Sequence, residues 1–254
     1  MEFYIKKNRI ILMLILLFPI SITLTQYKHD ITNSGINVLL FDSIFAGFNL
    51  FPLIFPIFII ALVSELNAYE WLSDIKSWSI IRIGYKKYIQ RKITSTLIIV
   101  SLYVIIGNIL ALIFLGITHG FHWSNDSQII APGLDNIFGP YLTTFILLII
   151  QITQAISYVF CSFWILQYTK RIWETIVYPF LLIVILPTLL FNLDIIPESL
   201  VPFNVNTALI SKSLNSTGMS TLINSLSIWF LLTIFYAIIM IISLLRKQRR
   251  GISQ

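Results

Sequence analysis

Apolar residues come in six long runs along this chain, and polar intervals separate them. A helix of about 20 apolar residues is long enough to cross the hydrocarbon core of a bilayer. We therefore predict an all-α membrane protein with six transmembrane helices in a single domain over residues 1–254. The predicted spans cover residues 10–25, 47–64, 94–117, 138–163, 175–193 and 222–245.

Two segments need a separate interpretation. Residues 10–25 follow basic residues, as in a signal peptide, but no small-residue cleavage site comes after them, so we expect an uncleaved span. Residues 194–221 are amphipathic and contain Pro197 and Pro202. This pattern predicts short helices that lie on the outer membrane face rather than another crossing.

The longest polar interval, Ser64–Lys92, separates the second and third runs. Its apolar positions in residues 69–78 recur at helical spacing, which predicts an amphipathic helix, or elbow, in the membrane interface. These positions are Trp71, Leu72, Ile75 and Trp78. Gly84 then permits a sharp turn, and residues 85–92 are expected to form a short helix with aromatic and basic side chains in the cytoplasm.

The composition agrees with a membrane protein, because 57% of the residues are hydrophobic and only 11% are charged. Soluble domains carry about 25% charged residues. All basic residues except Lys28 and Lys212 fall on one side of the six-span topology. By the positive-inside rule this side is cytoplasmic, which places both termini in the cytoplasm and the chain in the cell membrane. The anionic inner leaflet explains the net charge of +6 without a nucleic-acid partner.

The predicted spans contain no Asp, Glu, Lys, Arg or His. Ion-coupled carriers generally need ionisable groups near the bilayer midplane, so the sequence offers no means of using an ion gradient. The three histidines fall in predicted outer loops, which disfavours a metal site or a hydrolase within the membrane. A glycine-rich phosphate-binding loop is absent, and the single cysteine, Cys161, excludes an intramolecular disulfide. We therefore expect energy to come from another polypeptide.

Uncharged polar residues recur at three- and four-residue spacing on the fourth span, so they share one helical face. They are Gln151, Gln154, Tyr158 and Ser162. This face either makes hydrogen bonds between helices or lines a translocation path, and Asn108 on the third span is open to the same two interpretations. Pro179 and Pro187 on the fifth span are either ordinary kinks or a gate.

Around the elbow, the chain resembles the permease subunits of ABC transporters of the exporter, type-2 superfamily. The matching positions are Glu65 at the end of the second span, the helix 69–78, Arg82, Gly84, Tyr88 and Lys92. The resemblance implies a coupling helix that docks on a separate ATPase subunit, with Tyr85, Lys86 and Lys87 in the same segment. It also implies two permease and two ATPase chains, with ATP and Mg²⁺ on the ATPase and no cofactor or enzymatic activity on this chain.

The compact size and short loops are similar to those of Gram-positive permeases that export bacteriocins, lantibiotics or phenol-soluble modulins. We therefore expect an exporter subunit that moves an amphipathic or lipid-like substrate by alternating access. It would act as a homodimer or beside a related permease. A membrane immunity or sensor protein without transport is the main alternative, and an intramembrane enzyme is the second.

Overall fold

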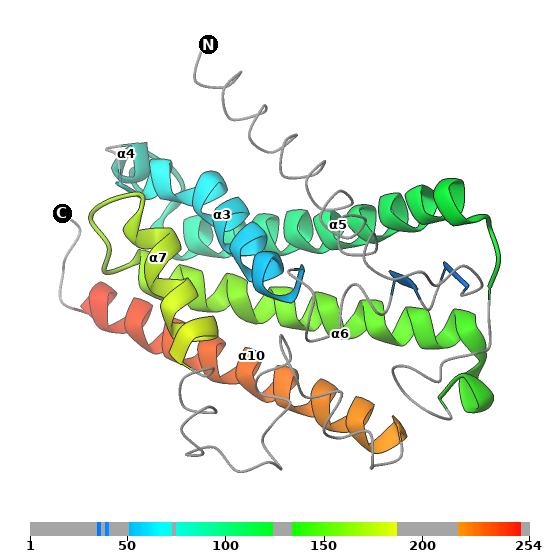
Figure 1. Ribbon diagram of the computed structural model, residues 1–254. Helices are drawn as coiled ribbons and strands as arrows, with labels where there is room; N and C mark the ends of the chain where they lie inside the picture. Colours follow the sequence, from blue (N-terminus) through cyan, green and yellow to red (C-terminus); the bar gives the residue numbers. More distant parts are fainter. Residues whose placement is uncertain are drawn as a thin grey trace.

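The computed structural model describes residues 35–36, 39–40, 51–72, 75–123, 134–186 and 218–249. These residues contain helices and no strand, so the all-α class is confirmed for this part of the chain. The helices are α3 (Phe51–Leu72), α4 (Ile75–Ile83), α5 (Tyr85–His119), α6 (Leu134–Leu166), α7 (Glu174–Phe180), the π-helix η1 (Leu181–Ile185) and α10 (Gly218–Arg249). Figure 1 shows the long helices arranged as a bundle.

Four helices are long and apolar enough to cross a membrane, and they match the predicted second, third, fourth and sixth spans. The candidate membrane-spanning helices cover Ile54–Leu72, Tyr85–His119, Thr144–Leu166 and Leu226–Arg246, and each contains an apolar window of 18 residues. A shorter apolar helix, Glu174–Ile185, covers the first part of the predicted fifth span. The predicted first span, Pro187 and the predicted outer helices before Gly218 lie outside the described residues. The chain has the helical character of a membrane protein.

Helix α6 lies at the centre of the described bundle. It contacts α10, α5, α3 and α7, and Figure 1 shows it running between α5 and α10. Its buried residues include Ile150, Ala155, Tyr158 and Val159, so one long face of α6 is closed off by the other helices. At its start, Gly139 has a positive φ of 71° and divides a short first segment from the main helix.

The outer faces of α5 and α10 are apolar. On α5 the exposed large apolar residues recur every three or four positions, at Ile98, Leu102, Ile106, Ile109 and Ile113. On α10 the corresponding residues include Phe230, Ile234, Ile238, Ile241 and Leu245. Continuous apolar surface of this extent is unfavourable in water but matches a hydrocarbon surrounding.

One end of the bundle, which we call the basic end, carries the positive charge. Figure 1 shows α4, the connection 167–173 and the C-terminal end of α10 at this end. Every Lys and Arg among the described residues belongs to it: Lys76, Arg82, Lys86, Lys87, Arg91, Lys92, Lys170, Arg171, Arg246, Lys247 and Arg249. The last residue of α5, His119, lies at the opposite end. The basic end thus contains the described Lys and Arg residues that the sequence analysis placed on a single side of the membrane.

Gly84 joins α4 to α5 without a linker. Its φ of 81° and ψ of 147° lie in a region that is essentially restricted to glycine. The Gly84 N–H donates to the Ile80 carbonyl at 2.8 Å, and the Gly84 carbonyl accepts from the Tyr88 N–H at 3.0 Å. The backbone therefore leaves the helical conformation at Gly84, the position where the sequence predicted a turn.

The helix limits around this turn differ from those predicted. Of the helix predicted over 69–78, Tyr69–Leu72 belongs to the end of α3 and residues 75–78 belong to α4, while residues 73 and 74 lie outside the described residues. Residues 85–92 are the first turns of α5 instead of a short helix of their own. The 35 residues of α5 extend over about 50 Å, which exceeds the hydrocarbon thickness of about 30 Å. These polar first turns therefore project beyond the apolar segment.

Replacing Gly84 with alanine is expected to destabilise the α4–α5 turn by about 1–3 kcal/mol. A Cβ at Gly84 would meet no atom within 4 Å, so the cost comes from the positive φ alone. Limited trypsin digestion of the detergent-solubilised protein should cut faster after Arg82 and Lys86 in the variant. Ser95→Ala, an exposed helical position on α5, serves as the control and should match the wild type. Unchanged digestion of Gly84→Ala would contradict the strained-turn account.

Candidate functional site

The α4–α5 elbow, which we now define as residues 75–92, presents apolar and basic side chains outside the bundle. Trp78 is 75% exposed and Ile81 is 81% exposed, and Arg82 is exposed beside them. Lys86 and Lys87, in the first turn of α5, are exposed as well. A short helix that shows tryptophan, isoleucine and arginine together offers both apolar contact and positive charge to a partner surface.

The predicted interfacial strip is divided between two environments. Trp71 is buried and Leu72 is half-buried in the last turn of α3, where both pack in the apolar core. Trp78, by contrast, is exposed on α4, and Ile75 begins that helix. Trp71 and Leu72 therefore pack α3 against the bundle, whereas Trp78 is exposed and can lie at a headgroup surface or on a partner.

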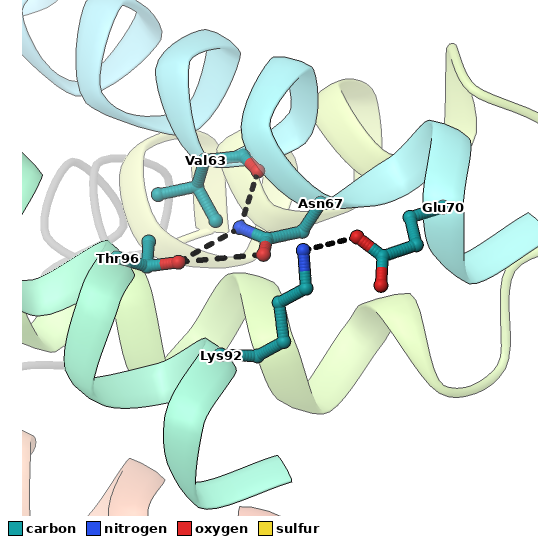
Figure 2. A network of polar contacts seen from close by, with 5 residues as sticks. All are labelled: Val63, Asn67, Glu70, Lys92 and Thr96. Atoms are coloured by element: carbon teal, nitrogen blue, oxygen red, sulfur yellow. Dashed lines mark hydrogen bonds and ion pairs between the residues drawn. The ribbon is translucent and has the colours of Figure 1, made fainter. Parts of the chain in front are cut away.

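A polar contact fixes the end of α3 to the start of α5 (Figure 2). The Asn67 side-chain N–H₂ donates to the Val63 carbonyl at 2.9 Å and to the Thr96 hydroxyl at 3.0 Å. One turn nearer the elbow, the Lys92 ammonium forms an ion pair with the Glu70 carboxylate. Both charged side chains are about one quarter exposed. The Asn67–Thr96 hydrogen bond and the Glu70–Lys92 ion pair therefore connect the end of α3 to the start of α5, next to α4 in the sequence.

Tyr88 takes part in the same contact, since its side chain hydrogen-bonds to Glu70. Tyr88 is buried in the first turns of α5. Its phenol O–H donates to the carboxylate. Glu70 thus receives a proton donor and a cation from successive turns of α5.

From the sequence we selected Glu65 as the acidic residue that matches the permease resemblance and did not select Glu70, which forms the ion pair with Lys92. Glu65 is half-buried and forms no ion pair within the described residues. The sequence did contain a pattern that indicates such a contact, because Tyr88, Lys92 and Thr96 recur every four residues on α5. Residues at this spacing form one stripe on a helix and meet the same neighbouring face.

Two more hydrogen bonds join other helices at the basic end. The Thr175 hydroxyl donates to the Ile172 carbonyl at 2.6 Å, so the Ser64 hydroxyl acts as donor in the Ser64–Thr175 bond between α3 and α7. The Ser243 hydroxyl of α10 donates to the Gln167 side-chain carbonyl at 2.7 Å, just after α6. Together with the α3–α5 contact, these bonds form a polar layer across the basic end.

The polar face of α6 is buried among the helices. Asn108 of α5 donates its side-chain N–H₂ to the Gln151 side-chain carbonyl at 2.8 Å and to the Val104 carbonyl at 2.8 Å. Along α6, the Gln154 side-chain N–H₂ donates to the Tyr158 hydroxyl at 2.7 Å. Gln151, Gln154, Tyr158 and Ser162 are each at most 3% exposed. The structure therefore brings Asn108 together with the predicted α6 face.

Three buried donors in this region have no hydrogen-bond partner among the described residues. They are the Gln151 N–H₂, the Ser162 hydroxyl and the Trp229 indole N–H. The Trp229 ring meets the Tyr158 ring edge-on, with centroids 5.7 Å apart, so α10 contributes to the same region. An unpaired buried polar group costs about 1–3 kcal/mol. An uncharged molecule with hydrogen-bond acceptors would remove that cost.

Trp229 was not predicted as a site residue from the sequence, because it lies within an apolar run. The residue type alone could have drawn attention to it, since a buried tryptophan normally needs a hydrogen-bond partner for its indole N–H.

Of the two prolines of the predicted gate, Pro179 lies within the described residues and Pro187 lies outside them. Pro179 is buried inside α7 and is followed directly by the wide turns of η1. Pro179 lacks the N–H that would donate to the Thr175 carbonyl, so the missing bond lies in the turn before it, within α7.

No protein-family model, curated protein or solved structure matches this chain. Among the described residues, His, Cys, Asp and Glu form no group of three or more that could hold a metal ion. Fold and composition together define a helical membrane protein with an exposed basic elbow and a buried, uncharged polar face.

We expect Glu70 and Lys92 to be energetically coupled. A double-mutant cycle with Glu70→Ala and Lys92→Ala should yield a coupling of about 0.5–1 kcal/mol, because the partly exposed pair is screened by water. Thermal unfolding in detergent measures it. A second cycle with Glu65→Ala and Lys92→Ala should be additive. Equal coupling in both cycles would contradict the assignment of Glu70 as the partner.

Proposed function

We propose that this chain is the membrane-spanning subunit of an ATP-driven exporter of the ABC type-2 superfamily. The observation that carries the proposal is the α4–α5 elbow, whose exposed Trp78, Ile81 and Arg82 lie between two membrane-length helices. In such a transporter a separate ATPase subunit docks on this segment. Two copies of the chain would work with two ATPase subunits, and the ATPase would hold ATP and Mg²⁺.

The orientation proposed is that the basic end and both termini lie in the cytoplasm. The clustering of Lys and Arg at one end supports it, because the positive-inside rule retains these residues in the cytoplasm. The elbow then lies where a cytoplasmic ATPase can reach it.

Energy would reach the membrane through the contacts behind α4. Gly84 joins the docking helix to α5, and the Asn67–Thr96 and Glu70–Lys92 contacts join α5 to α3. ATP binding performs work only if it favours one conformation over another. A movement of α4 would shift α3 and α5 together and thereby bias the bundle between inward- and outward-facing states.

The substrate we propose is amphipathic, such as a peptide toxin, a bacteriocin or a lipid-like molecule. The polar face of α6 and Asn108 would line its path, with Trp229 beside them. The buried unpaired groups here are two N–H donors and one hydroxyl, and none is charged. Such groups suit the carbonyl oxygens of a peptide and offer no site for an ion.

A photocrosslinker at Ile81 should capture an ATPase. The residue is replaced with a photoreactive phenylalanine analogue in the native host, and the adducts are identified by mass spectrometry. The same analogue at Phe235, an exposed apolar residue of α10, is the matched control. We expect an adduct with a nucleotide-binding subunit from Ile81 and none from Phe235.

Arg82→Glu should reverse the charge at this contact. The purified complex is expected to lose substrate-stimulated ATP hydrolysis at least tenfold while the membrane subunit remains folded. If the analogue at Ile81 captures no nucleotide-binding subunit, the exporter assignment is overturned, and a non-transporting immunity or sensor protein becomes the better account.

Leucine substitutions at Asn108 and Gln151 separate packing from transport. Asn108→Leu alone leaves both ends of the Gln151 amide unpaired and should lower stability by about 1–2 kcal/mol. The double variant removes both amides and should recover most of the stability. We expect the stable double variant to lose export, as measured by substrate release from cells. Normal export would identify this pair as packing only.

A further inference from the structure

A groove of about 490 Å³ lies between the end of α6 and the helix formed by α7 and η1. Most of its wall is aromatic or aliphatic: Trp164, Tyr168, Tyr178, Leu181, Leu182 and Leu186. Four of these side chains, Tyr168, Tyr178, Leu181 and Leu186, are between 45% and 62% exposed. The groove therefore opens outward, toward the surroundings of the bundle.

The groove begins at the basic end and runs toward the middle of the bundle. Tyr168 belongs to the connection at the basic end, whereas Tyr178, Leu182 and Leu186 follow on successive turns away from Glu174. From Tyr178 to Leu186 this wall is about 12 Å long. One leaflet of a bilayer core is about 15 Å thick, so the groove covers most of the depth of the acyl region of a single leaflet.

The mouth of the groove carries two positive side chains, Lys170 and Arg171, and the nearby Glu174 carboxylate accepts hydrogen bonds from the backbone. Lys170 and Arg171 are exposed and directly follow Thr169 of the groove wall. Their backbone N–H groups donate to the same Glu174 carboxylate oxygen at 2.8 and 3.2 Å. Neither side chain forms an ion pair within the described residues. The turn thus presents two positive side chains at headgroup depth.

Aromatic side chains complete this interface. Trp173 and Tyr178 pack edge-on with ring centroids 6.1 Å apart, and both are about half exposed. Tryptophan and tyrosine favour the boundary between hydrocarbon and headgroups. The cations and this aromatic pair therefore fix the depth at which the mouth of the groove lies.

We infer that the groove binds one anionic glycerophospholipid from the leaflet at the basic end. An acyl chain lies along Leu181, Leu182 and Leu186, and the phosphate lies against Lys170 and Arg171. A zwitterionic lipid of the same chain length fills the apolar wall equally well but neutralises less of the positive charge. This site is independent of the polar face of α6 and of any transport activity.

The test uses native mass spectrometry of the purified chain, titrated with phosphatidylglycerol or phosphatidylcholine of identical acyl chains. The wild type is expected to bind phosphatidylglycerol about thirtyfold more tightly. Lys170→Gln with Arg171→Gln should weaken phosphatidylglycerol binding by about thirtyfold and leave phosphatidylcholine binding unchanged. The matched control, Lys86→Gln with Lys87→Gln, removes the same charge at the elbow and should change either affinity less than twofold.

Leu181→Trp fills the groove with an apolar side chain and should weaken both lipids alike. If this variant proves unstable, the two charge variants still decide, because all four of their side chains are exposed. Equal binding of the two lipids to the wild type would overturn the proposal. So would an equal loss of phosphatidylglycerol binding in the two charge variants, since that result indicates general attraction to a positive protein.

Discussion

Polar side chains that leave water must find partners inside the bundle, and this requirement decides where the described helices meet. Asn67 and Thr96 define the contact of α3 with α5, and Asn108 and Gln151 define that of α5 with α6. Apolar contact alone selects weakly, because lipid tails are as apolar as leucine. Helix α6 carries several buried polar side chains, and its central position among the helices keeps them away from lipid.

The polar groups are satisfied unevenly along the bundle. At the basic end, Asn67, Glu70 and Gln167 all have partners on neighbouring helices or just beyond them. Gln151 and Trp229, further from that end, each keep an unpaired N–H among the described residues, and the Ser162 hydroxyl, one turn before the end of α6, is unpaired there as well. The basic end is therefore cross-linked, whereas the interior holds groups that gain from a new arrangement of the helices.

Hydropathy predicted the apolar segments of α3, α5, α6 and α10 because it measures the preference for leaving water. It could not predict that α3 continues to Leu72 or that α5 starts at Tyr85, since a polar helix beyond the membrane surface has no hydropathy signal. Spacing correctly placed Gln151, Gln154, Tyr158 and Ser162 on one buried face. The partner of Lys92 depends on the rotation of α3 about its axis, which a single sequence leaves undetermined.

The uninterrupted course of α5 gives the elbow a geometric consequence. Glycine ends this helix on both sides, at Gly84 and Gly120, and the 35 residues between them are continuously helical. A rigid rod of about 50 Å that tilts by about 10° about Gly84 carries its far end through about 9 Å. A displacement smaller than one side chain beside the elbow therefore becomes, at the opposite membrane face, a movement as wide as the spacing between packed helices.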